Sequence, residues 1–209
     1  LLSIAGAWSL IPRETLFSHS INPGSLSLTP DGKIMGYVAL DANNTKNVFM
    51  WDLSNGKKRQ VTFETRDVLA YYWTGVKDII LFVSDNYGDE NTMMFKKNIS
   101  EASSPTERTV VYQKRGVMAV MMSNNVKENY VLIGINDVDP RFHNVYKYDI
   151  LTNEHTLIFP NKRFSSVITD NKMRIRMTSE EQEDGSTIYY RLVHRGRRRA
   201  LRDQSLDTA

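Results

Sequence analysis

The stretch NVFMWDLSNG at residues 47–56 recurs as NVYKYDILTN at residues 144–153. Two weaker copies, NTMMFKKNIS at residues 91–100 and TIYYRLVHRG at residues 187–196, fit the same column. The copies begin at residues 47, 91, 144 and 187, and a spacing of about 45 residues is typical of a repeated four-stranded unit. The repetition predicts four similar units along the chain.

Each copy follows a strand, a polar turn and a second strand. These upstream segments are LSLTPDGKIMGYVAL (26–40), AYYWTGVKDIILFVS (70–84), VMMSNNVKENYVLIGI (120–135) and SVITDNKMRIRMTS (166–179). Turn chemistry between β-branched and aromatic runs indicates antiparallel sheets, and one such sheet must stack on its neighbours to bury both faces. The predicted fold is therefore all-β, a partial β-propeller of about four blade-like antiparallel sheets. The clearest strands are expected at residues 34–40, 47–53, 79–84, 92–97, 130–136, 144–150 and 188–193.

Composition indicates a folded domain and excludes several functions. The chain has 209 residues, 41% of them hydrophobic, which suffices for a sizeable core. Its net charge of +3 comes largely from an arginine cluster near the end of the sequence, and the body has no basic stripe, so no nucleic-acid binding is predicted. No stretch reaches the ~20 apolar residues of a membrane span. The absence of cysteine excludes disulfides, a thiolate nucleophile and a cysteine-ligated zinc site.

Three segments are expected. Residues 1–10 are predicted to be a signal-peptide remnant or an apolar lead segment, residues 11–193 the partial propeller, and residues 194–209 a basic, disordered tail. The start LLSIAGAW resembles the end of a signal peptide, which suggests a secreted or periplasmic protein; otherwise we expect a cytoplasmic one. The sequence begins without methionine, and a fragment explains four units more simply than a closed ring. Asn43-Asn44-Thr45 and Asn98-Ile99-Ser100 fit the glycosylation sequon, which matters only in a eukaryotic secretory host.

Two segments carry a family resemblance. DNYGDEN at residues 85–91 is similar to an Asp-x-x-Gly-Asp-Glu-Asn hairpin, and INDVDPRFHNVYKYDILTNEHTLIF at residues 135–159 is similar to an Asn-Asp-x-Asp-Pro-Arg-x-His-Asp-x-Tyr segment. Both occur in the N-terminal propeller of prolyl-oligopeptidase-family (S9) serine peptidases, akin to acylaminoacyl peptidases and dipeptidyl aminopeptidases. The resemblance covers residues 11–192, with Asn144 standing where Asp is usual and Thr29 where Ser is usual.

The resemblance implies a parent peptidase in which the propeller restricts substrate entry. In that family the propeller covers an α/β-hydrolase domain with a Ser-Asp-His triad, so the implied partners are that domain and peptide substrates. The nucleophile motif G-x-S-x-G is absent here, because GSLSL at residues 24–28 lacks the closing glycine. The chain alone is therefore predicted to be inactive, without cofactor or metal. The alternative is a TolB-like or WD-repeat propeller that serves as a protein-binding scaffold.

The family-like segments supply candidate site residues with structural or interdomain roles: Asp85, Gly88, Asp89, Glu90, Asn91, Asp137, Asp139, Pro140, Arg141 and His143. The first five could form an oxygen-rich calcium loop, but a hairpin whose side chains bond their own backbone is favoured. In the second group Pro140 is expected to close a turn and Arg141 to pair with an acid. General-base chemistry by His143 would require a positioned partner, and packing is favoured.

Two further groups are assigned to structure. The acidic run Glu180, Glu181, Glu183 and Asp184 is expected to be a solvated hairpin tip. Six aromatic residues are expected in the blade core, because alternation buries one face of each strand: Phe49, Trp51, Trp73, Tyr146, Tyr148 and Tyr189.

Overall fold

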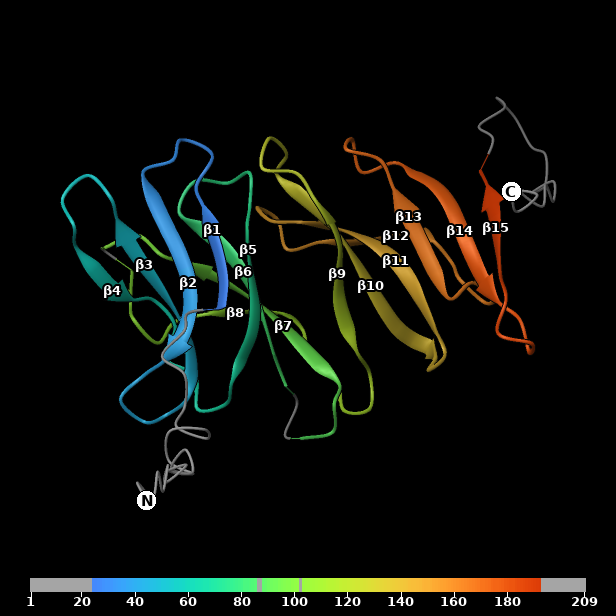
Figure 1. Cartoon of the computed structure of the whole chain (residues 1–209), viewed down its shortest axis with the longest axis horizontal. Coiled ribbons are helices and arrows are strands. Elements are labelled where there is room, and N and C mark those ends of the chain that lie inside the picture. The colour runs from blue at the N-terminus through green and yellow to red at the C-terminus, as the bar shows by residue number, and fades with distance from the viewer. Residues whose placement is uncertain (1–23, 86–87, 102, 193–209) are drawn as a thin grey trace, which may run out of the picture.

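The computed structural model describes residues 24–85, 88–101 and 103–192. The expected lead segment (1–10) and basic tail (194–209) lie outside these residues, as do 11–23 and 193. The described residues contain no helix, and hence none long and apolar enough to cross a membrane. They form four antiparallel sheets that follow one another in chain order (Figure 1).

Three sheets have four strands and the last has three strands among the described residues. The first contains β1 (Gly24–Leu28), β2 (Ile34–Leu40), β3 (Lys46–Asp52) and β4 (Lys58–Gln60), and the second β5 (Val68–Trp73), β6 (Ile79–Asp85), β7 (Thr92–Asn98) and β8 (Thr109–Tyr112). The third contains β9 (Ala119–Asn124), β10 (Tyr130–Asp139), β11 (Phe142–Asp149) and β12 (His155–Phe159), and the fourth β13 (Ser166–Thr169), β14 (Ile175–Glu181) and β15 (Thr187–Arg191). The predicted all-β partial propeller is confirmed.

The hydrophobic core lies between the sheets. Along β6, Ile80 and Phe82 pack toward the first sheet, whereas Leu81 and Val83 pack toward the third. All four are buried, because successive side chains of a strand point to opposite faces and this sheet has a neighbour on each side. The second strands of the inner sheets, β6 and the first half of β10, therefore consist of nearly continuous apolar runs.

The first and fourth sheets each leave one face uncovered by the described residues. On β1, Leu26 and Leu28 are 55% and 52% exposed. On the fourth sheet Ile168 and Tyr189 are 40% and 42% exposed. The expectation that Tyr189 lies in the core is therefore wrong, because its neighbour Tyr190, which is 4% exposed, takes the buried side of β15. Of the other five aromatic residues, Tyr148 is buried and the rest are half-buried.

A polar contact repeats from sheet to sheet. The Arg59 guanidinium donates to the carbonyl of Ile99, and the Lys96 ammonium donates to the carbonyl of Ile150 at 2.8 Å. Ile99 and Ile150 follow the third strands of their sheets and are buried. Leu53 holds the same position in the first sheet, where it is 44% exposed.

The second-to-third-strand hairpins of all four sheets lie along one edge of the row, at the bottom in Figure 1. The crossings that lead from one sheet to the next reach the same edge. The described parts of both family-like segments, at residues 85, 88–91 and 137–143, are thereby placed on it.

Candidate functional site

A cleft of about 590 Å³ opens at this hairpin edge, between the crossing that joins the first two sheets and the β6–β7 hairpin. Its charged groups are three carboxylates and one guanidinium, and Arg66 pairs with Asp85. The Asp67 carboxylate lies 3.6 Å from the ammonium of Lys46. The lining residues are Thr65, Arg66, Asp67, Leu69, Asp85, Gly88, Glu90 and Thr92. The cleft therefore carries a surplus of negative charge beside an exposed leucine.

The DNYGDEN hairpin is held by its own side chains. The Gly88 N–H donates to Asp85 at 2.8 Å and the Asn91 N–H donates to Asp89 at 3.0 Å. Burial acts to raise the pKa of Asp89, but hydrogen bonds from Asn91 and from the Gly116 backbone lower it overall. Gly88 and Glu90 have φ angles of +85° and +61°, a conformation that suits glycine and is strained for glutamate. In the described residues no group of three or more His, Asp or Glu is arranged to hold a metal ion.

The second segment bonds across the β10–β11 hairpin. Asp137 accepts from the Asn144 carboxamide at 2.9 Å and from the Tyr146 hydroxyl at 2.7 Å. Burial, followed by this hydrogen bond to Asp137, raises the pKa of Tyr146 to about 12. At the tip, the Arg141 side chain donates twice to Asp139, at 3.0 and 2.8 Å, and these bonds lower the pKa of Asp139 to about 2.

Pro140 and His143 lie beside this network. The carbonyl of Pro140 accepts from the Asn136 side chain at 3.0 Å. The Nε2 atom of His143 is buried without a hydrogen-bond partner in the described part of the chain, and burial lowers the pKa of this imidazole. Burial thus favours the neutral form of His143.

The structure brings together only some of the candidate site residues from the two family-like segments. Asp85, Gly88 and Glu90 line the cleft, whereas no lining residue comes from residues 137–143. The acidic run is also divided, because Glu180 accepts from Arg163 and Tyr190 at 2.8 Å each, while Asp184 bonds the Ser186 N–H within the turn.

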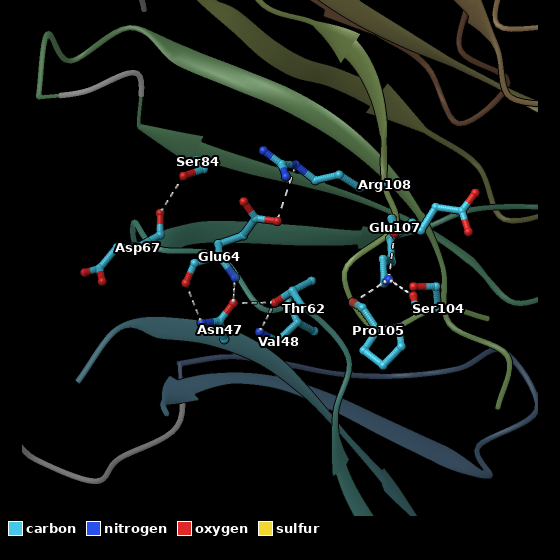
Figure 2. A network of polar contacts seen from close by, with 11 residues as sticks. Asn47, Val48, Thr62, Glu64, Asp67, Ser84, Ser104, Pro105, Glu107 and Arg108 are labelled. Carbon is cyan, nitrogen blue, oxygen red and sulfur yellow. Dashed lines mark hydrogen bonds and ion pairs between the residues drawn. The ribbon is translucent and has the colours of Figure 1, made fainter. Parts of the chain in front are cut away.

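Lys97 is a structural residue that the motifs do not reveal. It is 3% exposed, and its ammonium donates to the carbonyls of Ser104, Pro105 and Glu107 at 2.7 Å each (Figure 2). Burial lowers its pKa. Alternation along β7 is the sequence pattern that could have identified Lys97, because the residue lies on the buried face of that strand. An unpaired charge there would be costly, so a buried lysine predicts hydrogen-bond partners.

A second network holds the crossing that forms the wall of the cleft (Figure 2). The carboxamide oxygen of Asn47 accepts from the Thr62 hydroxyl at 2.8 Å and from the Glu64 N–H at 2.9 Å. Glu64 pairs with Arg108 at 3.4 Å, although burial raises the pKa of Glu64 despite that partner. The Ser84 hydroxyl donates to the carbonyl of Asp67 at 3.1 Å. The first and second sheets thus fix the position of the crossing.

Comparison with known proteins gives sequence relatives. The chain is 47% identical over 195 residues to dipeptidyl peptidase family member 6 of Caenorhabditis elegans. This alignment covers 91% of this chain and 26% of the relative. It is 28% identical over 189 residues to dipeptidyl aminopeptidase BIII of Pseudoxanthomonas mexicana, covering 87% of this chain and 26% of the relative. The chain thus spans about a quarter of the length of these curated relatives. No family model matches it.

Solved structures share the fold at low sequence identity. The β-propeller domain of the Trilobed protease from Pyrococcus furiosus aligns with a TM-score of 0.55 and 13% identity, over 81% of this chain and 54% of that one. TolB from Acinetobacter baumannii aligns with a TM-score of 0.54 and 13% identity, over 81% of this chain and 40% of that one. The stacked sheets, the two motif segments and the sequence relatives agree, and the chain belongs to the β-propeller region of the prolyl-oligopeptidase (S9) family.

Proposed function

We propose that this chain is a non-catalytic, substrate-gating part of a serine peptidase, and that an α/β-hydrolase domain elsewhere in the longer protein carries out peptide hydrolysis. The observation that carries the proposal is the 47% identity to a dipeptidyl peptidase family member in a chain that folds as stacked sheets. The sequence has no G-x-S-x-G nucleophile motif, which is consistent with a gating role.

Gating requires a stiff ring of blades, and we propose that further blades cover the exposed end faces. The repeated contact from a cation to the carbonyl of Ile99 or Ile150 supports this arrangement. At the same position in the first sheet, the hydrogen bonds found among the described residues include none to the carbonyl of Leu53, which we propose receives an equivalent lysine or arginine from a preceding blade. Exposed apolar strands favour association, so we expect the 209-residue chain alone to self-associate. A monodisperse monomer in light scattering would argue against open blade faces.

We further propose that the cleft contacts the peptide substrate through its negative charge. Asp85 is paired with Arg66, which leaves Glu90 as the carboxylate best placed to meet a positively charged group. In the longer gene product, Glu90→Gln is expected to raise KM for peptides with a free amino terminus and to leave acetylated peptides unaffected. Glu183→Gln, at the distant hairpin tip of the fourth sheet, is the matched control.

The first experiment is labelling with a serine-reactive fluorophosphonate. The longer gene product is expected to be labelled and to hydrolyse short chromogenic peptides, while the 209-residue chain is expected to do neither. Loosening the stacked sheets with Phe82→Ala, which removes a fully buried ring, is expected to admit longer unfolded polypeptides without changing kcat for short ones. Unchanged size selectivity in that variant would contradict gating by the propeller.

A protein-binding scaffold is the second candidate, because the described fold aligns equally well with TolB. It predicts a gene product that binds a protein ligand and is not labelled by the fluorophosphonate. The labelling experiment therefore separates the two functions.

A further inference from the structure

The two glycosylation sequons occupy different environments in the fold. We propose that Asn43 is an N-glycan acceptor in a eukaryotic secretory pathway and that Asn98 is not. This proposal does not depend on the peptidase function. It concerns a eukaryotic host because the relative with 47% identity is from Caenorhabditis elegans.

Asn43 stands at the tip of the β2–β3 hairpin, with its side chain exposed. Asp41 organises the tip by accepting from the backbone N–H groups of Asn43 and Thr45, at 2.8 and 3.0 Å. Asn44, the middle residue of the sequon, has a φ of +58° and is exposed. The hydrogen bonds found among the described residues include none from the Asn43 carboxamide or the Thr45 hydroxyl. Both groups that a glycosyltransferase must engage are therefore available.

Asn98 is held in the contact between the first two sheets. Its carboxamide oxygen accepts from the Ser100 N–H at 2.9 Å, and its side chain lines a groove beside Arg59. Ile99, the middle residue, is 3% exposed. Its N–H donates to the backbone carbonyl of Asp78 at 2.8 Å, and its carbonyl accepts from Arg59. The Asn98 side chain is itself exposed, but the backbone of its sequon is held on both sides of the buried Ile99. This sequon is therefore fixed against the neighbouring sheet, whereas the one at Asn43 lies on an open hairpin tip.

The reaction requires a lipid-linked oligosaccharide diphosphate as donor. The Nδ2 atom of Asn43 forms a bond to C1 of the first sugar, the bond from C1 to the phosphate oxygen breaks, and the lipid diphosphate leaves. Nδ2 loses one proton, and no oxidant or reductant is needed. The product is a neutral secondary amide at an exposed turn.

A glycan at Asn43 would lie at the edge of the sheets and leave their faces free to stack. The hairpin is tied to the cleft, since the N–H of Lys46 donates to Asp67 of the cleft wall at 2.9 Å. The glycan would therefore add bulk beside the cleft while leaving the inter-sheet core intact.

The experiment uses the 209-residue chain, secreted from eukaryotic cells behind a heterologous signal sequence. Peptide-N-glycosidase treatment in heavy-oxygen water converts each glycan-bearing asparagine to labelled aspartate, which peptide mass spectrometry locates. The variants are Asn43→Gln, Thr45→Ala and Thr45→Ser, and Asn98→Gln is the matched control. If secretion fails, the same readout is taken on the membrane-enclosed fraction of the cells.

We expect one glycan in the wild-type chain, its loss in Asn43→Gln and Thr45→Ala, and its retention in Thr45→Ser and Asn98→Gln. A wild-type chain without label at residue 43 would overturn the proposal. Label at residue 98 that survives Asn43→Gln would also overturn it.

Discussion

Replacing Lys97 with methionine keeps the length of the side chain but removes the ammonium that fixes the segment between β7 and β8. Three carbonyls, those of Ser104, Pro105 and Glu107, lose a donor at 2.7 Å. A hydrogen bond to a charged group contributes about 1.5–3 kcal/mol. Part of the loss is recovered, because methionine avoids the desolvation of a buried ammonium and because the residues that carry these carbonyls are exposed, which lets the segment turn the carbonyls toward water. The expected net destabilisation is about 3 kcal/mol.

The matched control is Lys96→Met on the same strand. Lys96 is half-buried and donates to Ile150 and Asn153. Because solvent screens this partly exposed ammonium, its loss is expected to cost only about 1 kcal/mol. Urea unfolding monitored by far-UV circular dichroism gives both free energies, and hydrogen exchange should show lost protection at residues 103–108 in Lys97→Met alone. Equal destabilisation of the two variants would refute the reasoning, as would unchanged exchange in that segment.

Three further predictions follow from single contacts. Gly75→Ala is expected to destabilise the chain strongly in thermal melts, because the added Cβ would lie 2.7 Å from backbone atoms of Glu128 in the next sheet; a melt like that of the wild type would contradict this close approach. The Asp139 carboxylate has a pKa of about 2 against an ordinary 3.8, so its stabilising contribution is complete above about pH 4 and is lost as the pH falls toward 2; Asp139→Asn should flatten that part of the stability profile. The Tyr146 hydroxyl has a pKa of about 12 against 10.0, so its contribution is present below pH 10 and lost as the pH rises to 12; Tyr146→Phe should remove this alkaline loss, and an unchanged slope would show that this hydroxyl is not the group responsible for it.

The sequence predicted the paired inner strands well and the outer strands poorly. The strand expected at residues 34–40 is β2 in full, and six others agree to within a few residues at each end. The fourth strands β4, β8 and β12 were not predicted individually. They are short, and burial within them is sparse, so alternation leaves little trace in residues such as Lys58 to Gln60. Their pairing depends on the third strand of the same sheet rather than on their own pattern.

Side-chain patterns could identify the motif segments but not the networks that support the site. The cleft joins Arg66 and Asp67 to Asp85 and Glu90, and these pairs are separated in sequence by a complete strand pair. Their proximity depends on how one sheet stacks on the next, which no local pattern encodes. The three acceptors of Lys97 are likewise backbone carbonyls, and carbonyls leave no signature in a sequence.

The acidic residues of the two motifs differ in what remains available to a ligand. Asp89 bonds within its turn, Asp137 accepts from two side chains of β11, and Asp139 is engaged twice by Arg141. Glu90 lines the cleft, and the hydrogen bonds and ion pairs found among the described residues include none to its carboxylate. Substitution of the bonded acids should therefore alter stability first, because their hydrogen bonds hold turns. Substitution of Glu90 should first alter the binding of a positively charged ligand, such as the amino terminus of a peptide, because its carboxylate is free to meet a cation in the cleft.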